Sequence, residues 1–393
     1  MSENFMGIPN HAGWKQYSFG NLCQTLSRGS APSYVPHSSV KAIGQRCVQN
    51  TGFDATQARP HDAGVTGVLH VQPGDVLLNS TGTGTIGRSC IFDHSGSFIA
   101  DSHVTVLRPK HSKVDSRWLN LALRSPWGQR HLETHCYTGS TNQIELSRLE
   151  LSRTVIPVPS IEEQRRIAEI LDALDSRFAV GVSIVQKLGL ISQGMLHDFM
   201  SSYTGGVGKR GVQVRCSDGF RLASGRPYPA ERSQGQGGVP IYGASGAFSY
   251  GDLSMTPGPT FTIGRVGEGS VGVVNYVPGE AWVTDNALWA TWVHSDWSPK
   301  FIAYYLKWFN LRKVRSQTGQ PLVTQTVISP LPLPRPSLEE QVRAVEVLDS
   351  VNSQMDQERT VLAKLSSLKQ GLAEDLLTGR VRVPEAEAVV ESL

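Results

Sequence analysis

Two glycine-rich segments of this chain have the spacing of a known ligand-binding motif. Each has the form G-x-G-x-x-G, at Gly82, Gly84 and Gly87 and again at Gly267, Gly269 and Gly272. In a dinucleotide-binding fold this motif lies between a strand and a helix whose N-terminus holds a pyrophosphate. Here β-branched and aromatic stretches follow, R-S-C-I-F-D and V-V-N-Y-V. They predict a hairpin whose second strand begins at once, with glycines that let another backbone approach closely.

The other candidate motifs for catalysis or metal binding are incomplete. G-G-V-G-K-R near Lys209 has Tyr203 where a P-loop needs its first glycine, and no Ser or Thr follows the lysine. In H-L-E-T-H, His131 and His135 lie one helical turn apart, but the glutamate is misplaced for H-E-x-x-H, which favours solvated or capping histidines over zinc. The sequence has no G-x-S-x-G, kinase or N-P-P-Y-type motif. We therefore expect no catalytic residues, metal site or cofactor in this chain.

Polar and basic side chains surround both glycine segments and are suited to nucleic acid. Arginine, asparagine and glutamine read base edges, while Ser, Thr and glycine amides bind phosphates. The candidates in the first half are Arg28, Ser80, Thr81, Thr83, Thr85, Arg88, Asn142 and Gln143. Those in the second half are Arg226, Arg265, Ser270, Asn275, Lys313, Arg315, Gln317 and Gln320. For any single one, a plain surface role is at least as compatible with the sequence.

A long repeat shows which elements must position these residues. S-I-E-E-Q-R-R-I-A-E-I-L-D at 160–172 returns as S-L-E-E-Q-V-R-A-V-E-V-L-D at 337–349, with eight of thirteen positions identical and an offset of 177 residues. Each copy follows a proline-rich segment that cannot be helical. Ser160 and Ser337, each with a glutamate three residues on, predict helix N-caps with capping boxes. The chain thus contains two similar units, with an expected approximate two-fold relation.

Each repeat opens an apolar stripe with helical spacing over about 40 residues, which corresponds to a helix of roughly 60 Å. Two such stripes most economically bury each other as an antiparallel coiled coil, although two independent core helices are also compatible with the pattern. The residues expected to pair the helices are Leu171, Leu174, Phe178, Leu188, Leu348, Met355, Leu362 and Leu365. Gly181 predicts a kink or break, and Gly194, aligned with Gly371, a close helix approach.

The regions before the two helices repeat as well, which makes the repeated unit a domain plus a helix. Both are rich in short strand-like runs, and both contain a glycine segment, then a helix-like stretch, R-W-L-N-L-A-L or K-F-I-A-Y-Y-L, before the proline strand. We therefore predict a mixed α/β (α+β) fold with two globular domains separated by two long helices. The segment at 201–211 reads as a linker.

The amino-acid composition excludes few classes of protein. The 393 residues have room for several cores, the net charge of +3 is only mildly basic, and five scattered cysteines indicate reduced thiols. We expect no membrane span and no secretion signal, and therefore a cytoplasmic protein.

The pattern as a whole resembles the specificity subunit of Type I restriction-modification systems. The resemblance rests on the duplicated E-E-Q helix start, on Lys187 and Lys364 within the helices, and on L-L-T-G-R at 376–380. The second domain adds I-Y-G-A-S-G, I-G-R and V-T-D-N-A-L. The resemblance covers about residues 13 to 383. The glycines of the first helix and S-S-Y-T-G-G at 201–206 depart from it.

The resemblance implies a non-catalytic DNA-recognition subunit for a bipartite double-stranded target. Residues 1–159 and 204–336 would be target recognition domains, 160–203 and 337–380 spacer helices, and 381–393 a tail. The implied partners are two modification subunits, which use S-adenosylmethionine to methylate adenine at N6, and restriction subunits, which use ATP and Mg. Two alternatives stay open: a coiled-coil protein scaffold without DNA specificity, and a nuclease or methyltransferase fragment.

Overall fold

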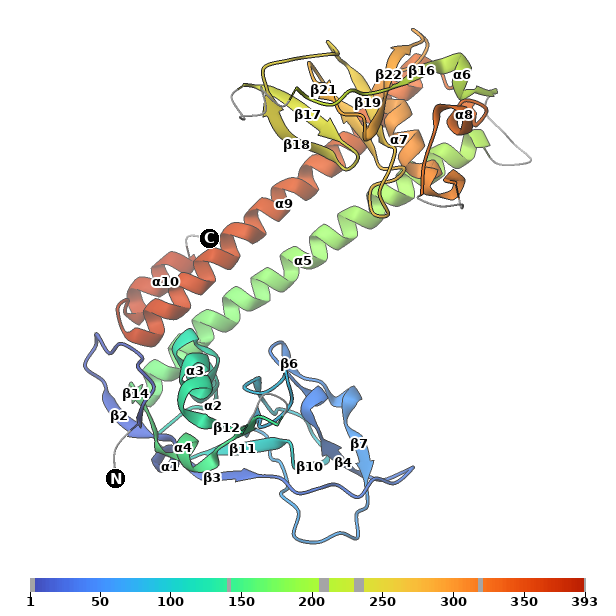
Figure 1. Cartoon of the computed structure of the whole chain (residues 1–393). Coiled ribbons are helices and arrows are strands. Elements are labelled where there is room, and N and C mark those ends of the chain that lie inside the picture. Colours follow the sequence, from blue (N-terminus) through green and yellow to red (C-terminus); the bar gives the residue numbers. More distant parts are fainter. Residues whose placement is uncertain (1–3, 140–142, 205–211, 230–236, 317–320, 392–393) are drawn as a thin grey trace. The chain divides into compact units, whose positions relative to one another are not determined.

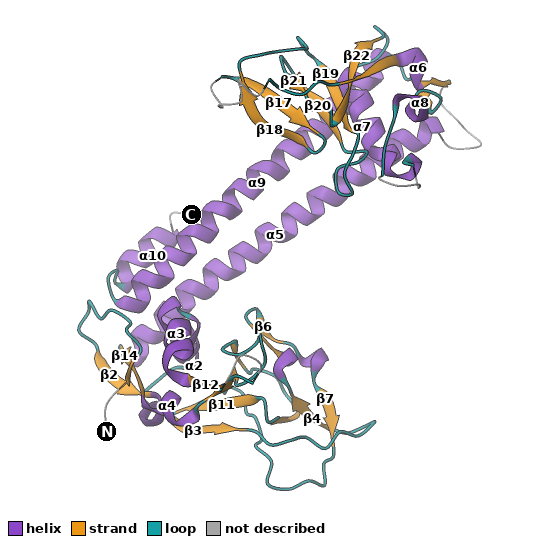
Figure 2. Ribbon diagram, viewed as in Figure 1, coloured by secondary structure: helices purple, strands orange, loops and turns teal. Residues whose placement is uncertain are grey.

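A computed structural model describes residues 4–139, 143–204, 212–229, 237–316 and 321–391. The chain divides into two compact units, one made of Met1–Val180 with Leu362–Leu393 and the other of Gly181–Val361. The first is called unit 1 and the second unit 2. Each combines small sheets, short helices and parts of two long helices (Figures 1 and 2).

The main sheet of unit 1 has four antiparallel strands in the order β3-β11-β8-β9. They span Cys23–Arg28, Val104–Pro109, Val76–Asn79 and Ser89–Ile91. A second sheet, β10-β4-β7, spans Ser97–Ala100, Val40–Ile43 and Arg59–His61, and a third, β1-β14-β2, spans Asn4–Phe5, Thr154–Val158 and Lys15–Ser18. Two-stranded pairs join β5 (Val48–Gln49) with β6 (Gly52–Phe53) and β12 (Tyr137–Thr138) with β13 (Glu145–Leu146).

The short helices of unit 1 pack on these strands. They are α1 (Phe19–Leu22), α2 (Ser116–Arg124), α3 (Pro126–His131) and α4 (Arg148–Arg153), and a π turn, Leu132–Cys136, follows α3. The fully buried Trp118 of α2 donates from Nε1 to the carbonyl of Pro157 at 3.1 Å. The proline-rich strand is thereby fixed to the domain directly before the long helix begins.

Unit 2 repeats the order of the main sheet as β16-β22-β19-β20. These strands span Phe220–Ser224, Ala287–Val293, Thr260–Gly264 and Val274–Val277. The smaller sheets are β18-β17-β21 (Gly246–Gly251, Val239–Gly243, Trp282–Val283) and β15-β23 (Gln213–Arg215, Pro332–Pro334). Helices α6 (Cys216–Gly219), α7 (Pro299–Phe309) and α8 (Gln325–Ile328) complete the unit, and α7 packs on β19 and β20. The equal strand order bears out the duplicated domain that the sequence predicts.

The two long helices are α5 (Ile161–Thr204) and α9 (Leu338–Thr378). At the start of α9 the capping box is complete: the amide of Ser337 donates to Oε2 of Glu340 at 2.8 Å, and the amide of Glu340 donates to Oγ of Ser337 at 3.3 Å. At the start of α5 Ser160 caps in the same way, at 3.2 Å from the amide of Glu163. The Glu163 carboxylate instead accepts a hydrogen bond from Nη2 of Arg382 at 2.8 Å.

A buried glutamine joins each long helix to its domain. Gln164 accepts at Oε1 from the amide of Asp115 at 2.8 Å and donates from Nε2 to the carbonyls of Lys113 and Pro159. In unit 2, Gln341 makes the same three bonds, with the amide of Ser298 and the carbonyls of Asp296 and Pro336. Both glutamines are 0% exposed. This is the structural role of the glutamine in the repeated E-E-Q.

The long helices pack together and run antiparallel, as predicted. In unit 2, a Cβ built on Gly189 of α5 would lie 3.9 Å from Sδ of Met355, and Oγ of Ser192 donates to Oδ1 of Asn352 at 3.1 Å. From Gly189 to Ser192 the contact partner on α9 moves from Met355 back to Asn352, so the two helices run in opposite directions. In unit 1, Lys369 of α9 pairs with Asp175 of α5.

The predicted pairing residues divide by their burial. Leu171, Leu174 and Leu365 belong to the core of unit 1, and Phe178 packs against that core. Leu348 is buried, whereas Leu188, Met355 and Leu362 are half-buried.

The expected break at Gly181 and the expected close approach at Gly194 are wrong. The helix continues through Gly181 without a break, because a cost of about 1 kcal/mol per glycine is small beside tertiary packing. A Cβ added at Gly194 or Gly371 would meet nothing within 4 Å outside its own stretch of helix, so neither glycine marks a close helix approach.

The segment predicted as a tail contains a helix, α10 (Val383–Glu391). Val383 and Ala386 are buried in the core of unit 1, and Nε of Arg166 on α5 donates to Oε1 of Glu387 at 3.1 Å. By length and composition alone, α5 could also cross a membrane, which the sequence interpretation did not anticipate.

Candidate nucleic-acid interface

The two glycine segments form hairpin loops with the same backbone hydrogen bonds, as predicted. The first joins β8 to β9, where the amide of Gly87 donates to the carbonyl of Asn79 at 3.0 Å. The second joins β19 to β20, where the amide of Gly272 donates to the carbonyl of Gly264 at 2.8 Å. Left-handed φ angles occur at Gly82 (96°), Gly87 (83°), Gly267 (95°) and Gly272 (75°), where an L side chain would be strained.

An arginine binds the same carbonyl of each loop from a different place in the sequence. In unit 1, Nη2 of Arg88, within the loop itself, donates to the carbonyl of Gly84 at 2.7 Å. In unit 2, Nη2 of Arg312, which follows α7, donates to the corresponding Gly269 at 2.5 Å. The sequence analysis missed Arg312 because nothing in the aligned motifs marks that position. Each loop thus carries a cationic group.

The side chains of the first loop are held by Gln45, which the sequence analysis also missed. Its Nε2 donates to Oγ1 of Thr81 at 2.9 Å, and Oγ1 of Thr85 donates to its Oε1 at 2.8 Å. Thr81 is also 2.7 Å from Nδ1 of His103. The two threonines therefore fix the shape of the loop, whereas Thr83 at its tip is exposed.

Other first-half candidates lie in varied surroundings. Ser80 is 0% exposed and bonds Thr105 at 2.6 Å, so it holds β8 to β11 and offers no group to a ligand. Arg28 pairs with Glu145 at 3.0 Å and lowers the pKa of that carboxyl, mainly by its hydrogen bond. Gln143 is exposed, and Asn142 lies outside the described residues.

The second-half candidates are arranged around the other loop. Oγ of Ser270 lies 2.6 Å from Oγ of Ser245, and Nη1 of Arg265 donates to Oγ of Ser224 at 3.3 Å. Among the described residues, Nδ2 of Asn275 is buried without a hydrogen-bond partner. Arg226, Lys313 and Arg315 are exposed, and Gln317 and Gln320 lie outside the described residues.

A concave surface of about 620 Å³ adjoins the second loop. Val266 and Ser245 line it on the loop side, with Tyr228, Phe248 and Asn286 around them. Phe248 is 67% exposed, so its ring is accessible to a ligand in this concave surface. Aromatic rings beside amide and hydroxyl groups can stack on or pack against bases. Sequence patterning did not single out Phe248, because one exposed aromatic residue has no periodic signature.

In the part of the chain that the structure describes, the cysteines and histidines lie in surroundings that are not those of a nucleophile or a metal centre. All five cysteines are buried, and burial raises the pKa of Cys90 and Cys216 to about 12, so these thiols stay protonated. The structure holds no cluster of three or more potential metal ligands within the described ranges. His131 is 3% exposed and bonds Thr154 at 2.9 Å, which corrects the expectation that it is solvated or capping. Burial, and then His135, lowers the pKa of His131 to about 4.

Comparison with known proteins connects this arrangement to one family. The family model described as Type I restriction modification DNA specificity domain matches residues 68–182 and 212–367, more than half of the chain. A putative type I restriction enzyme MjaX specificity subunit from Methanocaldococcus jannaschii is 21% identical over 341 residues, covering 79% of each chain.

Solved structures share the fold. The S subunit of a Type I restriction-modification system from M. genitalium matches with a TM-score of 0.64 at 16% identity, covering 96% of this chain and 99% of that one. The HsdS subunit from Thermoanaerobacter tengcongensis gives 0.50 at 18% identity, covering 95% and 98%. The predicted fold class, two mixed α/β domains with two long paired helices, is confirmed. On the evidence of its duplicated domains, its glycine loops and the family model, the chain belongs to the Type I restriction-modification DNA specificity family.

Proposed function

We propose that this chain is the subunit that selects a bipartite double-stranded DNA target, with unit 1 and unit 2 each binding one half-site. The observation that carries the proposal is the pair of glycine loops, which share their backbone hydrogen bonds but differ in the residues between the glycines. A constant backbone with variable side chains suits two readers that dock alike on the duplex and select different bases. As a member of the specificity family, the chain itself is non-catalytic.

The DNA-contacting residues are proposed from exposure and charge. Arg88 and Arg312 place a guanidinium on each loop. The other proposed contacts are exposed polar or basic side chains, namely Thr83, Gln143, Arg226, Lys313 and Arg315. Arg265, half-buried, would contact DNA from the edge of the second loop. Phosphate contacts by these cations would make binding strongly salt-dependent.

The long helix α5 carries exposed apolar side chains that could bind partner subunits. On α5, Ile184, Leu190, Ile191 and Met195 are 37%, 69%, 50% and 38% exposed. We assign this apolar surface to two docked methyltransferase subunits, rather than to a membrane. Those subunits would carry S-adenosylmethionine and methylate adenine at N6, while restriction subunits would use ATP and Mg. The complex would act in the cytoplasm.

Methylome sequencing with and without the gene tests the proposal. One bipartite adenine-methylated motif should disappear on deletion and return on complementation. A complementing chain with the first loop, residues 80–88, replaced by that of a relative should change one half of the motif and leave the other. An unchanged methylome after deletion would exclude the proposed role and favour a scaffold without DNA specificity.

A further inference from the structure

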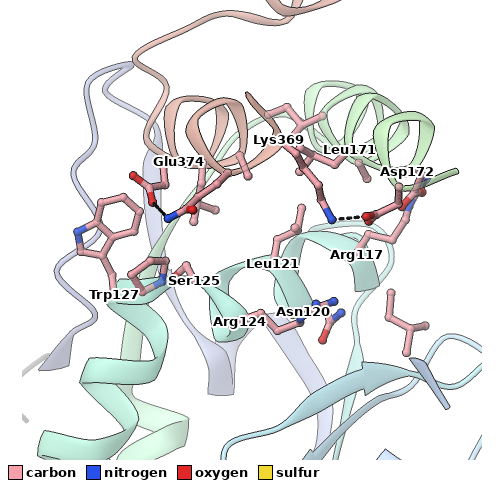
Figure 3. Close-up of a pocket in the computed structure, with 18 residues that line it drawn as sticks. Arg117, Asn120, Leu121, Arg124, Ser125, Trp127, Leu171, Asp172, Lys369 and Glu374 are labelled. Carbon is pink, nitrogen blue, oxygen red and sulfur yellow. Dashed lines mark hydrogen bonds and ion pairs between the residues drawn. The ribbon is translucent and has the colours of Figure 1, made fainter. Parts of the chain in front are cut away.

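Unit 1 contains a pocket of about 260 Å³ that the DNA-recognition role does not use. Figure 3 shows it between α2 and α3 on one side and the helices α5 and α9 on the other, with Leu121 and Leu171 pointing into it and Trp127 at its edge. Its floor is apolar, and its rim carries three cations and three carboxylates, namely Arg117, Arg124, Lys369, Asp172, Asp175 and Glu374. An engineered apolar cavity of about 150 Å³ is enough to hold benzene.

The duplicated chain shows what occupies the corresponding place in unit 2. The two regions share contacts at equivalent positions, since the Arg117–Asp172 ion pair (3.3 Å) corresponds to Lys300–Asp349 (2.6 Å). The buried glutamines bind corresponding amides in the same way. The positions around the pocket can therefore be compared one by one.

At four lining positions unit 2 has the larger side chain. Leu121 corresponds to Tyr304, Ser125 to Trp308, Ala373 to Leu196 and Ile91 to Tyr276. The Tyr304 hydroxyl donates to Oδ1 of Asp349 at 2.8 Å and accepts from Nδ2 of Asn352 at 3.0 Å. Those two residues correspond to Asp172 and Asp175 on the rim of the unit 1 pocket. A phenol thus fills in unit 2 the space that is open in unit 1.

The rim of the open pocket keeps the polar groups that a phenol needs. Asp172 stands where Asp349 accepts the hydroxyl of Tyr304, and it is well exposed, at 62% of its side chain. Asp175 stands where Asn352 donates in unit 2, and it is paired with Lys369, whose ammonium is the donor at this part of the rim. Three cations and three carboxylates leave the rim without a net formal charge, so it has no overall electrostatic preference for an ionic ligand.

We propose that this pocket binds a phenol group, with the ring between Leu121, Leu171 and Ala373 and the hydroxyl donating to Asp172. The pocket is only partly enclosed, so the ring can come from a tyrosine of a partner polypeptide or from a free phenolic compound. Interface pockets of this kind commonly take tyrosine as an anchor.

Binding of p-cresol to the full chain, followed by saturation-transfer NMR, tests the pocket directly. The wild type should bind it more tightly than toluene, which lacks the hydroxyl. Leu121→Tyr, which installs the residue of unit 2, should weaken p-cresol binding at least tenfold, and Ala373→Leu should do so from the opposite wall. Leu149→Tyr, at an exposed position of α4, is the matched control and should leave p-cresol binding unchanged.

Failure of the wild type to bind p-cresol, or equal affinity in Leu121→Tyr and Ala373→Leu, would overturn the proposal. A second experiment, which rests on the proposed function, identifies the source of the ring. It measures assembly of each variant with the methyltransferase subunit. Weaker assembly of Leu121→Tyr but not Leu149→Tyr identifies a partner tyrosine. Equal assembly of both, with p-cresol bound, identifies a free phenol. Because the p-cresol arm needs neither DNA nor partners, its result is independent of the DNA-recognition role.

Discussion

Oε1 of Gln164 accepts a hydrogen bond from the backbone amide of Asp115 at 2.8 Å. Through this bond and two to backbone carbonyls, the first turn of α5 is tied to the N-terminus of α2 and to the proline-rich strand. The same set recurs at Gln341. A recognition domain and its helix are thus joined by a fully satisfied buried amide, which specifies their mutual orientation more sharply than apolar contact does.

Replacing Gln164 with methionine should lower the free energy of unfolding by about 2–3 kcal/mol, because the Asp115 amide and two carbonyls lose their partner in a buried site. Chemical denaturation measures the loss, and faster hydrogen exchange at the Asp115 amide would localise it. Gln193→Met, at an exposed position of α5, serves as the control. Unchanged exchange at Asp115 in the Gln164 variant would contradict the role of the bond.

Asp75→Asn should destabilise the first recognition domain by about 3–5 kcal/mol. The Asp75 carboxylate is 1% exposed and binds Arg108 bidentately, at 2.8 and 2.7 Å, so its loss leaves a largely buried guanidinium without its counter-charge. Asp93→Asn, at a side chain that is 79% exposed, should have almost no effect. Thermal unfolding of both variants makes the comparison.

The stability of unit 1 should fall as the pH drops from about 6.5 towards 4. His131 has a pKa of about 4 in the folded chain, against about 6.5 when unfolded, so within that window only the unfolded chain takes up the proton. His131→Gln, which can still bond Thr154, should flatten the dependence of the unfolding midpoint on pH. The exposed His37→Gln should not. An equal slope in wild type and His131→Gln would refute this assignment.

Leu174→Asp should disrupt helix pairing and, with it, assembly of the modification complex. Leu174 is 0% exposed in the core that also holds Leu365, and an unpaired carboxylate there carries a large desolvation cost. Leu365→Asp should act alike. Size-exclusion chromatography with the methyltransferase subunit reports assembly, with Ala173→Asp on the exposed face of α5 as the control. Normal elution of both leucine variants would contradict the prediction.

Arg88→Ala and Arg312→Ala should each impair one half-site only. Each arginine binds the central carbonyl of its own loop. Its loss removes that loop contact and, in the proposed role, a cation that contacts DNA. We expect weakening by about 1–3 kcal/mol, measured as binding to targets with either half-site scrambled. Arg359→Ala, on the exposed surface of α9, should bind normally. Equal effects on both half-sites would contradict the assignment of one half-site to each unit.

Much of the fold could be predicted from local signals. The duplicated E-E-Q segment, with its serine cap and preceding prolines, marks the start of both long helices, and the β-branched residues after the glycines mark both hairpins. The continuity of α5 could not be predicted, because its glycines argue against a helix locally and only packing outweighs them. The helical C-terminus was also missed, since its contacts with Glu163 and Arg166 are more than 200 residues distant in sequence.

The candidate site was predicted less well than the fold. The glycine loops were found because their backbone needs residues that tolerate left-handed φ. Gln45 and Arg312 were missed because each reaches its loop from another part of the chain, where nothing local indicates the contact. Ser80 was chosen for its neighbours in sequence, yet it directly follows a strand that is buried throughout and is itself 0% exposed.

The division of the chain has a consequence for its synthesis. Unit 2 is one continuous stretch, Gly181–Val361, whereas unit 1 needs Leu362–Leu393 as well as the N-terminal half. On the ribosome, the domain encoded first therefore cannot complete its core until the residues from Leu362 onwards emerge, although the domain encoded second can already be folded. Leu376, Leu377 and Ala386 are part of that core, so a message truncated near its end would yield a chain with one intact reader and one exposed apolar surface.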